Sequence, residues 1–427
     1  MDDKFKLNRE DRTAVPGKFD DDMDAASDAV HARRGEPADY VYVREPAALA
    51  RLMRRLRAAK SVALDTEADS LHNYAEKVCL IQLTVGEAHF VVDPLSELDL
   101  AAFVEVLADK RLILHGADYD LRLLRAWMGF RPRGEVFDTM VAAQLLGIEQ
   151  IGLASLVEQL LDVALVKDLQ KSDWSRRPLS ETQLRYAVND TRYLEALAER
   201  LHGELLQWER VAWHRESCRA MVEATGQDRA RDPEDIWRIK GAGRLSRRQL
   251  AYLREIWRWR DTLARRVNRP IFKVLQNQKI LELVEWADTH PGVAPDQGPR
   301  LPRDIVGSRR RALGHALDRA AAMAESEWPE LRRAARPDVL PFNDKELDAL
   351  RADCARIATE LGIAPWTLAP KAALENIART RPRSEEETMA CSGLLRWQTE
   401  LVQGAVHGAL HTAERKTAAK SRRRPRR

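Results

Sequence analysis

A chain of 427 residues, 44% hydrophobic and 32% charged, is larger than one hydrophobic core usually organises, so two or three domains are expected. It contains no apolar run of roughly 18 residues and begins with a charged segment, which argues against a membrane-spanning helix and a secretory leader. We therefore expect a cytoplasmic protein that does not contact membranes. Four cysteines without paired spacing argue against a zinc site or a disulfide framework.

The charges are unevenly distributed, although the formal net charge is only +4. Residues 1–37 contain an acidic stretch and few large apolar residues, and residues 413–427 form a strongly basic tail. We expect both ends to be disordered. The basic tail is either a solvated extension or a contact for a polyanion, and its composition fits both interpretations.

The apolar patterns of the N-terminal region predict, in order, a strand at 40–43, a helix at 47–59, and strands at 61–69, 78–85 and 89–92. The last two strands flank the turn-forming pair Gly86 and Glu87, which predicts a hairpin. Antiparallel strands followed by alternating helices and strands indicate a mixed α/β sheet.

The strand at 61–69 carries two carboxylates one residue apart, Asp65 and Glu67. Side chains of a strand alternate between its two faces, so both carboxylates lie on the same side of the sheet. Hard cations such as Mg²⁺ and Mn²⁺ prefer carboxylate and water ligands. The pair is either a metal-binding pair or the ordinary polar end of a strand.

The next segments predict a helix at 98–107, a strand at 112–114, a helix directly after it, and helices at 137–146 and 152–161. The helix after the short strand has Asp118 and Asp120 in its first turn. Acidic residues are common at ordinary helix starts because they complement the helix dipole. However, ligand sites of α/β sheets form beyond the carboxyl ends of strands, so a functional interpretation also stays open.

A polar loop at 167–178 combines Lys171, Arg176 and Arg177 with Trp174. Basic side chains can pair with phosphates while an indole stacks on a base, so we interpret these four residues as candidate substrate-binding residues for single-stranded nucleic acid. The alternative is a solvated loop that is anchored by its tryptophan.

The clearest predicted helix spans 180–201, where Ser180 and Gln183 have the spacing of a capping box. Tyr186 and Asp190 are four residues apart and therefore share one face of this helix. A phenol and a carboxylate on one face can position a water molecule beside a metal, although such a pair also occurs by chance on helix surfaces.

Together, the carboxylates of Asp65, Glu67, Asp120 and Asp190 and the phenol of Tyr186 are what a two-metal phosphodiesterase requires. In such enzymes two divalent ions about 3.5–4 Å apart stabilise the attacking and leaving oxygens. The segments LDTEAD, HGADYDLRLL and YAVNDTRYL resemble the three exonuclease motifs of the DEDD superfamily, in the branch with Tyr-x-x-x-Asp. FDTMVAAQLLG and SDWSRRPLSETQLRYAVND extend the match to the ribonuclease D family, which the chain resembles strongly over about residues 40–215.

The resemblance implies a role for each site residue. Asp65 bridges two metal ions, and Glu67 and Asp190 complete the site that binds the attacking water. Asp120 holds the second metal, partly through water. Tyr186 orients the nucleophilic water, whose pKa the metal lowers.

The resemblance also selects Asp120 over Asp118, because the family places the carboxylate directly before the Leu of DLRLL. The matching segments further contain Gln82, His115 and Asp138. These three residues either support the site or, as we favour, make structural hydrogen bonds.

The C-terminal half is helical in pattern and rich in arginine and tryptophan. Residues 230–300 resemble the HRDC module that follows the nuclease in the ribonuclease D family, and residues 301–412 resemble a second, diverged copy. The stretch THPGVAPDQGPRLP is interpreted as a loop or linker between them. The arginine-rich helices could bind phosphates without reading sequence, although solvated helix faces have the same composition.

The sequence therefore predicts an α/β plus all-α protein: a mixed-sheet, ribonuclease H-like exonuclease domain at 38–215 followed by two helical HRDC-like domains. The resemblance implies a monomeric 3′–5′ exoribonuclease that uses two divalent metal ions, Mg²⁺ or Mn²⁺, to trim structured RNA such as precursor tRNA and to release nucleoside 5′-monophosphates. Two alternatives stay open, a DNA 3′–5′ exonuclease of the same superfamily and a non-catalytic RNA-binding adaptor.

Overall fold

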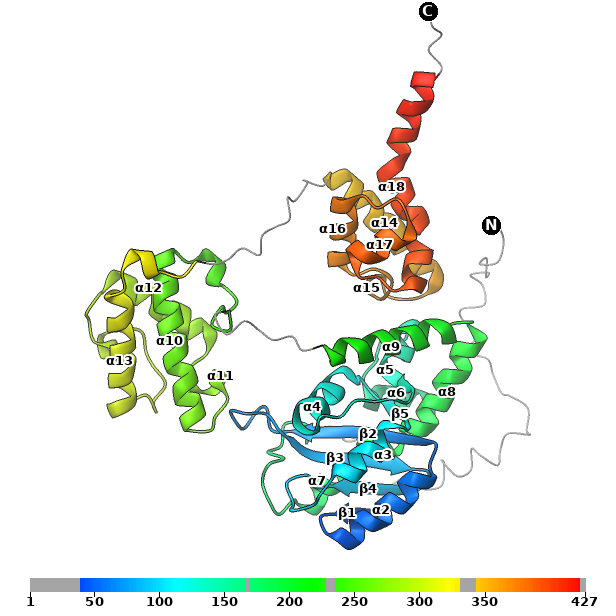
Figure 1. Cartoon of the computed structure of the whole chain (residues 1–427), viewed down its shortest axis with the longest axis horizontal. Helices are drawn as coiled ribbons and strands as arrows, with labels where there is room; N and C mark the ends of the chain where they lie inside the picture. Colours follow the sequence, from blue (N-terminus) through cyan, green and yellow to red (C-terminus); the bar gives the residue numbers. More distant parts are fainter. Residues whose placement is uncertain (1–38, 166–168, 228–234, 331–342, 423–427) are drawn as a thin grey trace, which may run out of the picture.

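The computed structural model describes residues 39–165, 169–227, 235–330 and 343–422, with side chains up to His411. Figure 1 shows an α/β body (39–227), a first helical body (235–330) and a second helical body (343–411). The segment 1–37, which we expected to be disordered, lies outside the described residues, as does the start of the predicted loop at 167–178.

Six strands form one mixed sheet in the α/β body, in the spatial order β1-β4-β3-β2-β5-β6. Their bounds are β1 Tyr40–Val43, β2 Ser61–Ala68, β3 Val78–Val85, β4 Ala88–Val92, β5 Arg111–Leu114 and β6 Val136–Asp138. Strands β3 and β4 form the predicted antiparallel hairpin, and β5 runs parallel to β2. The predicted mixed sheet is confirmed. Strand β6 was not predicted, because its three residues are too few to show an alternating pattern.

Alternate residues of the central strand β2 face two different helical layers. Val62 and Leu64 pack with one layer, and Ala63 packs with the other. The first layer contains α2 Pro46–Ala58, α3 Ala101–Ala108 and α4 Asp118–Met128. The second contains α5 Thr139–Leu145, α6 Leu153–Leu161, α7 Glu181–Arg192 and α8 Leu194–Gln207. The face of β2 with odd residue numbers is therefore the one that meets α7.

The predicted helix at 180–201 is two helices, α7 and α8, which are separated at Tyr193. The start is as expected, because Ser180 and Gln183 form a reciprocal capping box. The interruption lets α7 cover β3 while α8 packs against α5 and α6. A single continuous apolar pattern does not reveal a change of packing partner, so the sequence predicted one helix.

The α/β body extends beyond the boundary that we expected at residue 215. Helix α9, Val211–Gly226, packs against α4, α5 and β6. Its buried His214 lies against Phe137, with ring centroids 4.2 Å apart, and its Nε2 contacts the carbonyl oxygen of Asp138 at 3.0 Å. These contacts make α9 part of the sheet-containing body.

The first helical body consists of α10 Arg247–Arg266, α11 Ile271–Val274, α12 Asn277–Thr289 and α13 Gly307–Ala321. The expected domain boundary at 300/301 is wrong, because α13 packs against α10 and buries Leu313, Ala316 and Leu317 in the same core. The Pro/Gly-rich stretch before α13 is therefore a loop inside this body and not a linker between two bodies.

The second helical body consists of α14 Asp344–Leu361, α15 Pro365–Leu368, α16 Lys371–Thr380, α17 Glu385–Ser392 and α18 Arg396–Arg422. Helix α18 continues into the segment at 413–427 that we expected to be disordered. The interpretation of this body as a second HRDC-like domain stays a prediction. Within the described residues, no helix combines the length and the apolar character that crossing a bilayer requires.

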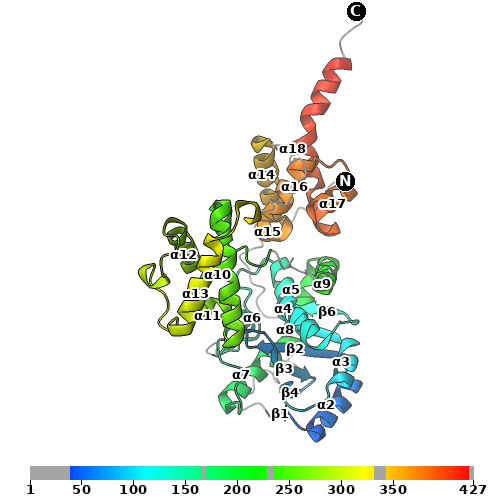
Figure 2. The same ribbon diagram turned by 60° about the vertical axis from the view of Figure 1, so that its left-hand side comes forward.

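Both helical bodies contact the α/β body. The second body shares a buried core with α5, α6 and α8, and it lies above α9 in Figure 1. The first body touches the β2–β3 loop, where the Tyr74 hydroxyl donates to Asp261 at 2.7 Å. Figure 2 shows the same neighbourhoods from a second direction.

Candidate active site

The end of strand β2 presents two carboxylates on one face of the sheet. Asp65 lies opposite Gln82 of β3, and Glu67 lies opposite Leu80. The ladder is interrupted by a bulge directly after Glu67, where β2 leaves the regular sheet. The alternation that the sequence predicted therefore places both carboxylates on the side covered by α7.

Helix α7 brings a third carboxylate to the same place. Oxygen atoms of Asp65, Glu67 and Asp190 lie within 4.8 Å of one another. Tyr186, one helical turn before Asp190, is buried on the same helix, and its ring lies beside the indole of Trp174. Asp190 thus meets the distant pair Asp65 and Glu67 because α7 packs across β2 and β3.

Asp120 reaches the site from the first turn of α4, where its carboxylate accepts a hydrogen bond of 2.5 Å from the hydroxyl of Thr66. It is only 5% exposed. Asp118, in contrast, is exposed and pairs with Arg122 at 2.9 Å. The structure therefore orients Asp120, not Asp118, toward the end of β2.

Thr66 is a site residue that the sequence interpretation missed. It occupies the position between Asp65 and Glu67, so its side chain points to the opposite face of β2, toward the layer that contains α4. The alternation of side chains along the strand could have predicted this role. It places the Thr66 hydroxyl on the opposite face from Asp65 and Glu67, where it can hydrogen-bond a residue of the other helical layer.

Asp138 fixes the start of α4. Its carboxylate accepts hydrogen bonds from the backbone N–H groups of Gly116 and Ala117 at 3.0 and 2.7 Å. It also caps α5 by accepting from Met140 and Val141. In this structure Asp138 makes structural hydrogen bonds, as we favoured, and they join the first turn of α4 to that of α5.

His115 belongs to the same junction. Its Nδ1 lies 2.9 Å from the hydroxyl of Thr139, and burial lowers the pKa of its imidazole, so the ring is held neutral. The hydroxyl of Thr139 in turn donates to the carbonyl oxygen of Leu114 at 3.1 Å. The hydrogen bonds of His115 are thus structural ones, also as we favoured.

Burial raises the pKa of each carboxyl group in the cluster, and repulsion between cluster members adds to this for Asp65 and Glu67. The pKa of Asp65 is raised well above its ordinary value by burial and then by the charges of Asp120, Asp190 and Glu67. Burial and the charges of Asp190 and Asp120 raise the pKa of Glu67 to about 9. Burial raises the pKa values of Asp120 and Asp190 to about 7.

This donor set fits a hard divalent cation. In the part of the chain that the structure describes, no lysine or arginine forms an ion pair with Asp65, Glu67 or Asp190. Carboxylates this close to one another are stabilised when a cation lies between them, and all-oxygen ligand sets suit Mg²⁺ and Mn²⁺. The arrangement of these carboxylates is therefore suited to a divalent metal ion.

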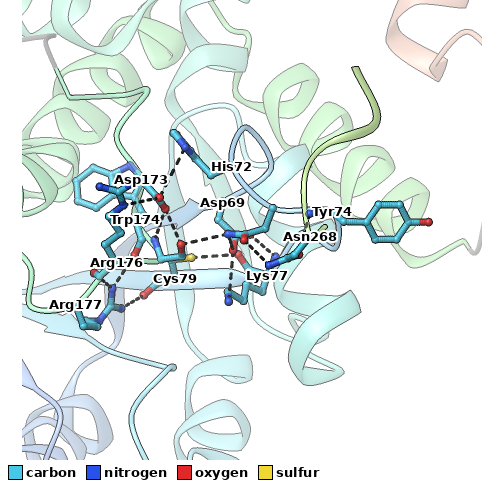
Figure 3. A network of polar contacts seen from close by, with 12 residues as sticks. Asp69, His72, Tyr74, Lys77, Cys79, Asp173, Trp174, Arg176, Arg177 and Asn268 are labelled. Carbon is cyan, nitrogen blue, oxygen red and sulfur yellow. Dashed lines mark hydrogen bonds and ion pairs between the residues drawn. The ribbon is translucent and has the colours of Figure 1, made fainter. Parts of the chain in front are cut away.

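The loop at 169–178 lies beside the β2–β3 loop, and polar contacts join them (Figure 3). His72 Nε2 contacts the carbonyl oxygen of Lys171 at 3.0 Å, and Asn73 donates to the hydroxyl of Ser175 at 3.2 Å. Asp69, which is fully buried, accepts from the amide of Asn73 at 2.7 Å. The two loops form one connected edge of the site.

Two of the four candidate substrate-binding residues, Trp174 and Arg177, make contacts within the fold. Trp174 is only 1% exposed, so base stacking by its indole is contradicted by its place in the core. The guanidinium of Arg177 donates to the carboxylate of Asp93. It also donates to the carbonyl oxygen of Cys79 (Figure 3). Lys171 and Arg176 are exposed, and their assignment as substrate-binding residues stays a prediction.

Two family models match the chain. Residues 40–206 match a 3′-5′ exonuclease domain, and residues 249–291 match an HRDC domain. The first match covers β1 to α8 and contains every carboxylate of the site, and the second lies within the first helical body.

The chain is also similar to proteins whose names state an activity. It is 33% identical to a ribonuclease D of Pseudomonas paraeruginosa over 87% of this chain and 98% of the relative. A second ribonuclease D, from Acidiphilium cryptum, is 33% identical over 75% of this chain and 83% of the relative.

Solved structures agree with this relationship. The structure of Escherichia coli RNase D, described as an exoribonuclease involved in structured RNA processing, superposes with a TM-score of 0.67. It is 26% identical and covers 87% of this chain and 98% of that chain. A protein from Bifidobacterium adolescentis has the same fold, with a TM-score of 0.74, 23% identity, and coverage of 87% of this chain and 97% of that chain.

Proposed function

The chain belongs to the ribonuclease D family and is a 3′–5′ exoribonuclease, and we propose that it trims 3′ extensions of structured RNA, such as precursor tRNA, by two-metal-ion hydrolysis. The observation that carries the chemistry is the meeting of Asp65, Glu67 and Asp190, whose oxygens lie within 4.8 Å of one another. The proposed products are nucleoside 5′-monophosphates, and the proposed active species is a monomer.

The proposed division of labour follows from the elements that carry the residues. Asp65, Glu67 and Asp190 would hold one divalent cation, and Asp65 and Asp120 a second. When bound, such ions make a water molecule more acidic and stabilise the charge that develops on the attacking and leaving oxygens. Thr66 keeps the Asp120 carboxylate in place from the opposite face of β2.

Tyr186 is proposed to orient the attacking water. Burial and the charges of Asp190, Glu67 and Asp65 raise the pKa of its phenol, so the hydroxyl keeps its proton at neutral pH. A protonated phenol can donate to one oxygen and accept from another at once. The phenol can therefore orient a water molecule through hydrogen bonds without removing its proton.

RNA is the proposed substrate because the named relatives are ribonucleases, and the described carboxylates by themselves do not distinguish ribose from deoxyribose. The exposed side chains of Lys171 and Arg176 are proposed to contact the RNA backbone next to the site, where they supply positive charge without reading sequence.

The test uses a tRNA transcript with a 3′ extension and a DNA strand of the same sequence, each labelled at the 5′ end. Each is incubated with Mg²⁺, with Mn²⁺ and with EDTA, and the products are separated by length. Metal-dependent stepwise shortening of the RNA alone is expected. Shortening of the DNA at a comparable rate would assign a broader DNA-degrading activity, and no shortening of either would indicate an adaptor that only binds RNA.

A further inference from the structure

Gln82 is a fully buried residue whose side-chain amide makes no hydrogen bond within the described structure. It is 0% exposed, and neither its Nε2 nor its Oε1 has a partner among the described residues. A buried donor or acceptor without a partner destabilises the fold, so most such groups in proteins are hydrogen-bonded. An amide that is left unpaired in this way indicates that it takes up its hydrogen-bond partner in another state of the protein.

The position of Gln82 identifies that partner. Gln82 lies directly opposite Asp65 in the antiparallel ladder between β3 and β2. Side chains of such a pair leave the sheet on the same face, with Cβ atoms roughly 4.5–5.5 Å apart. The Asp65 carboxylate is therefore within reach of the Gln82 amide through a change of side-chain rotamer.

The face on which Gln82 lies is the one that meets α7. The next residue on this face, Thr84, lies 2.9 Å from the hydroxyl of Thr191, which directly follows Asp190 in α7. Leu80, the preceding residue on the same face, packs in the cluster that contains Tyr186. Gln82 is thus enclosed between the sheet and the helix that completes the acidic cluster.

The neighbouring strands make the two sides of Asp65 different. On one side, β5 ends at Leu114 and pairs with β2 only as far as Ala63. On the other side, β3 continues past Asp65 and places Gln82 there. The Gln82 amide therefore lies on the side of the Asp65 carboxylate that β3 covers. Asp120 of α4 lies on the other side, where β5 has ended.

We propose that Gln82 is a positioning residue for Asp65: its Nε2 donates to one carboxylate oxygen and thereby turns the carboxylate toward a bound divalent cation. The inference rests on the proposed metal site. An amide is suited to this task because it donates without adding charge to a cluster that already contains four carboxylates. Hydrogen bonds to metal ligands orient the ligands and strengthen metal binding.

The test is Mn²⁺ binding measured by isothermal titration calorimetry on the full chain without RNA. The variants are Gln82→Met, which keeps the length of the side chain but removes the amide, and Leu83→Met, which perturbs the same strand on the opposite face. Gln82→Met is expected to weaken Mn²⁺ binding about 10- to 100-fold. Its thermal stability in EDTA should equal or exceed that of the wild type, since an unpaired buried amide is removed. Leu83→Met should bind Mn²⁺ as the wild type does.

A second measurement uses only the wild-type protein, so it does not depend on whether a variant folds. In wild-type protein with ¹⁵N-labelled glutamine, the side-chain amide signal of Gln82 should shift when Mg²⁺ is added, because a new hydrogen bond forms. An unshifted signal, or an Mn²⁺ affinity of Gln82→Met equal to that of the wild type, overturns the inference about Gln82 alone. If the wild type and Asp65→Asn both fail to bind Mn²⁺, the proposed metal site itself is wrong.

Discussion

Trp213 of α9 and Trp397 of α18 stack with ring centroids 4.8 Å apart and planes inclined by 13°. The contact joins the α/β body to the second helical body across 184 positions of the chain. Next to it, Glu216 accepts from the backbone N–H of Arg396 at 2.6 Å, at the start of α18, where a negative charge complements the helix dipole. The second helical body is therefore docked by a specific aromatic and polar contact.

We predict that Trp397→Ala destabilises the protein by about 3–5 kcal/mol, because a large buried aromatic side chain leaves a cavity when it is truncated. The matched control is Trp366→Ala in the same body, since Trp366 is 70% exposed and should change stability by no more than about 0.5 kcal/mol. Urea unfolding followed by circular dichroism measures both. Equal effects of the two substitutions would show that the stack does not carry the docking.

The first helical body is held at the β2–β3 loop by Asn268. Its side chain donates to Asn73 at 2.7 Å and accepts from the backbone N–H of Tyr74 at 3.2 Å. Its φ of 46° lies in the left-handed region, which asparagine and glycine tolerate better than other residues.

Asn268→Gly is therefore predicted to remove the two side-chain contacts without straining the backbone. The amide hydrogen of Tyr74 should then exchange with solvent faster than in the wild type, because it loses its acceptor. Hydrogen exchange followed by mass spectrometry on peptides that contain the β2–β3 loop measures this effect. As a control, peptides from α18 should exchange at unchanged rates. Unchanged protection of the β2–β3 loop would show that Asn268 does not hold it.

Asp65→Ala is predicted to abolish turnover and to leave RNA binding largely intact. Asp65 lies at the centre of the acidic cluster, so its loss removes a ligand of the proposed metal ions, whereas the proposed contacts to the RNA backbone come from other residues. Asp118→Ala is the control, because Asp118 is exposed and paired with Arg122. Retained cleavage by the Asp65 variant would disprove the assignment of the site.

Tyr186→Phe should retain activity but at a rate reduced by about 10²-fold, the lower range for a group that orients a proton-transferring water. The ring still fills its place beside Trp174, so the fold is preserved while only the hydroxyl is lost. Single-turnover cleavage at saturating metal isolates the chemical step. A rate equal to that of the wild type would exclude the proposed role of the phenol.

The buried imidazole of His89 should make the free energy of unfolding depend on pH. Burial, with a smaller contribution from Arg192, lowers the pKa of its imidazole from 6.5 to about 4. The unfolded chain therefore binds a proton at a higher pH than the folded one, so the contribution of neutral His89 is complete above pH 6.5 and is lost as the pH falls toward 4.

His89→Asn should accordingly lose less stability than the wild type when the pH is lowered through this range. Urea midpoints at a series of pH values measure the difference between the two proteins. His407→Asn on the exposed surface of α18 is the control and should follow the wild-type profile. If the urea midpoints of the wild type and of His89→Asn change with pH in parallel, His89 does not cause this loss of stability.

The sequence by itself determined the residues of the acidic cluster, because each was identified by a local rule. Alternation along a strand placed Asp65 and Glu67 on one face, and the helical repeat placed Tyr186 and Asp190 on another. Resemblance to family motifs then joined these separate pairs and selected Asp120. The hairpin of β3 and β4 and the capping box of α7 were likewise readable from short segments.

Only the tertiary structure decided which of these and other side chains are buried and what they contact. Trp174 looked like a stacking residue in a polar loop, but it packs in the core beside Tyr186. Helix α13 belongs to the first helical body because of its contacts with α10, and the second body docks through Trp213 and Trp397. These outcomes depend on contacts between residues far apart in the chain, whose energies are not encoded in any local pattern of polarity or spacing.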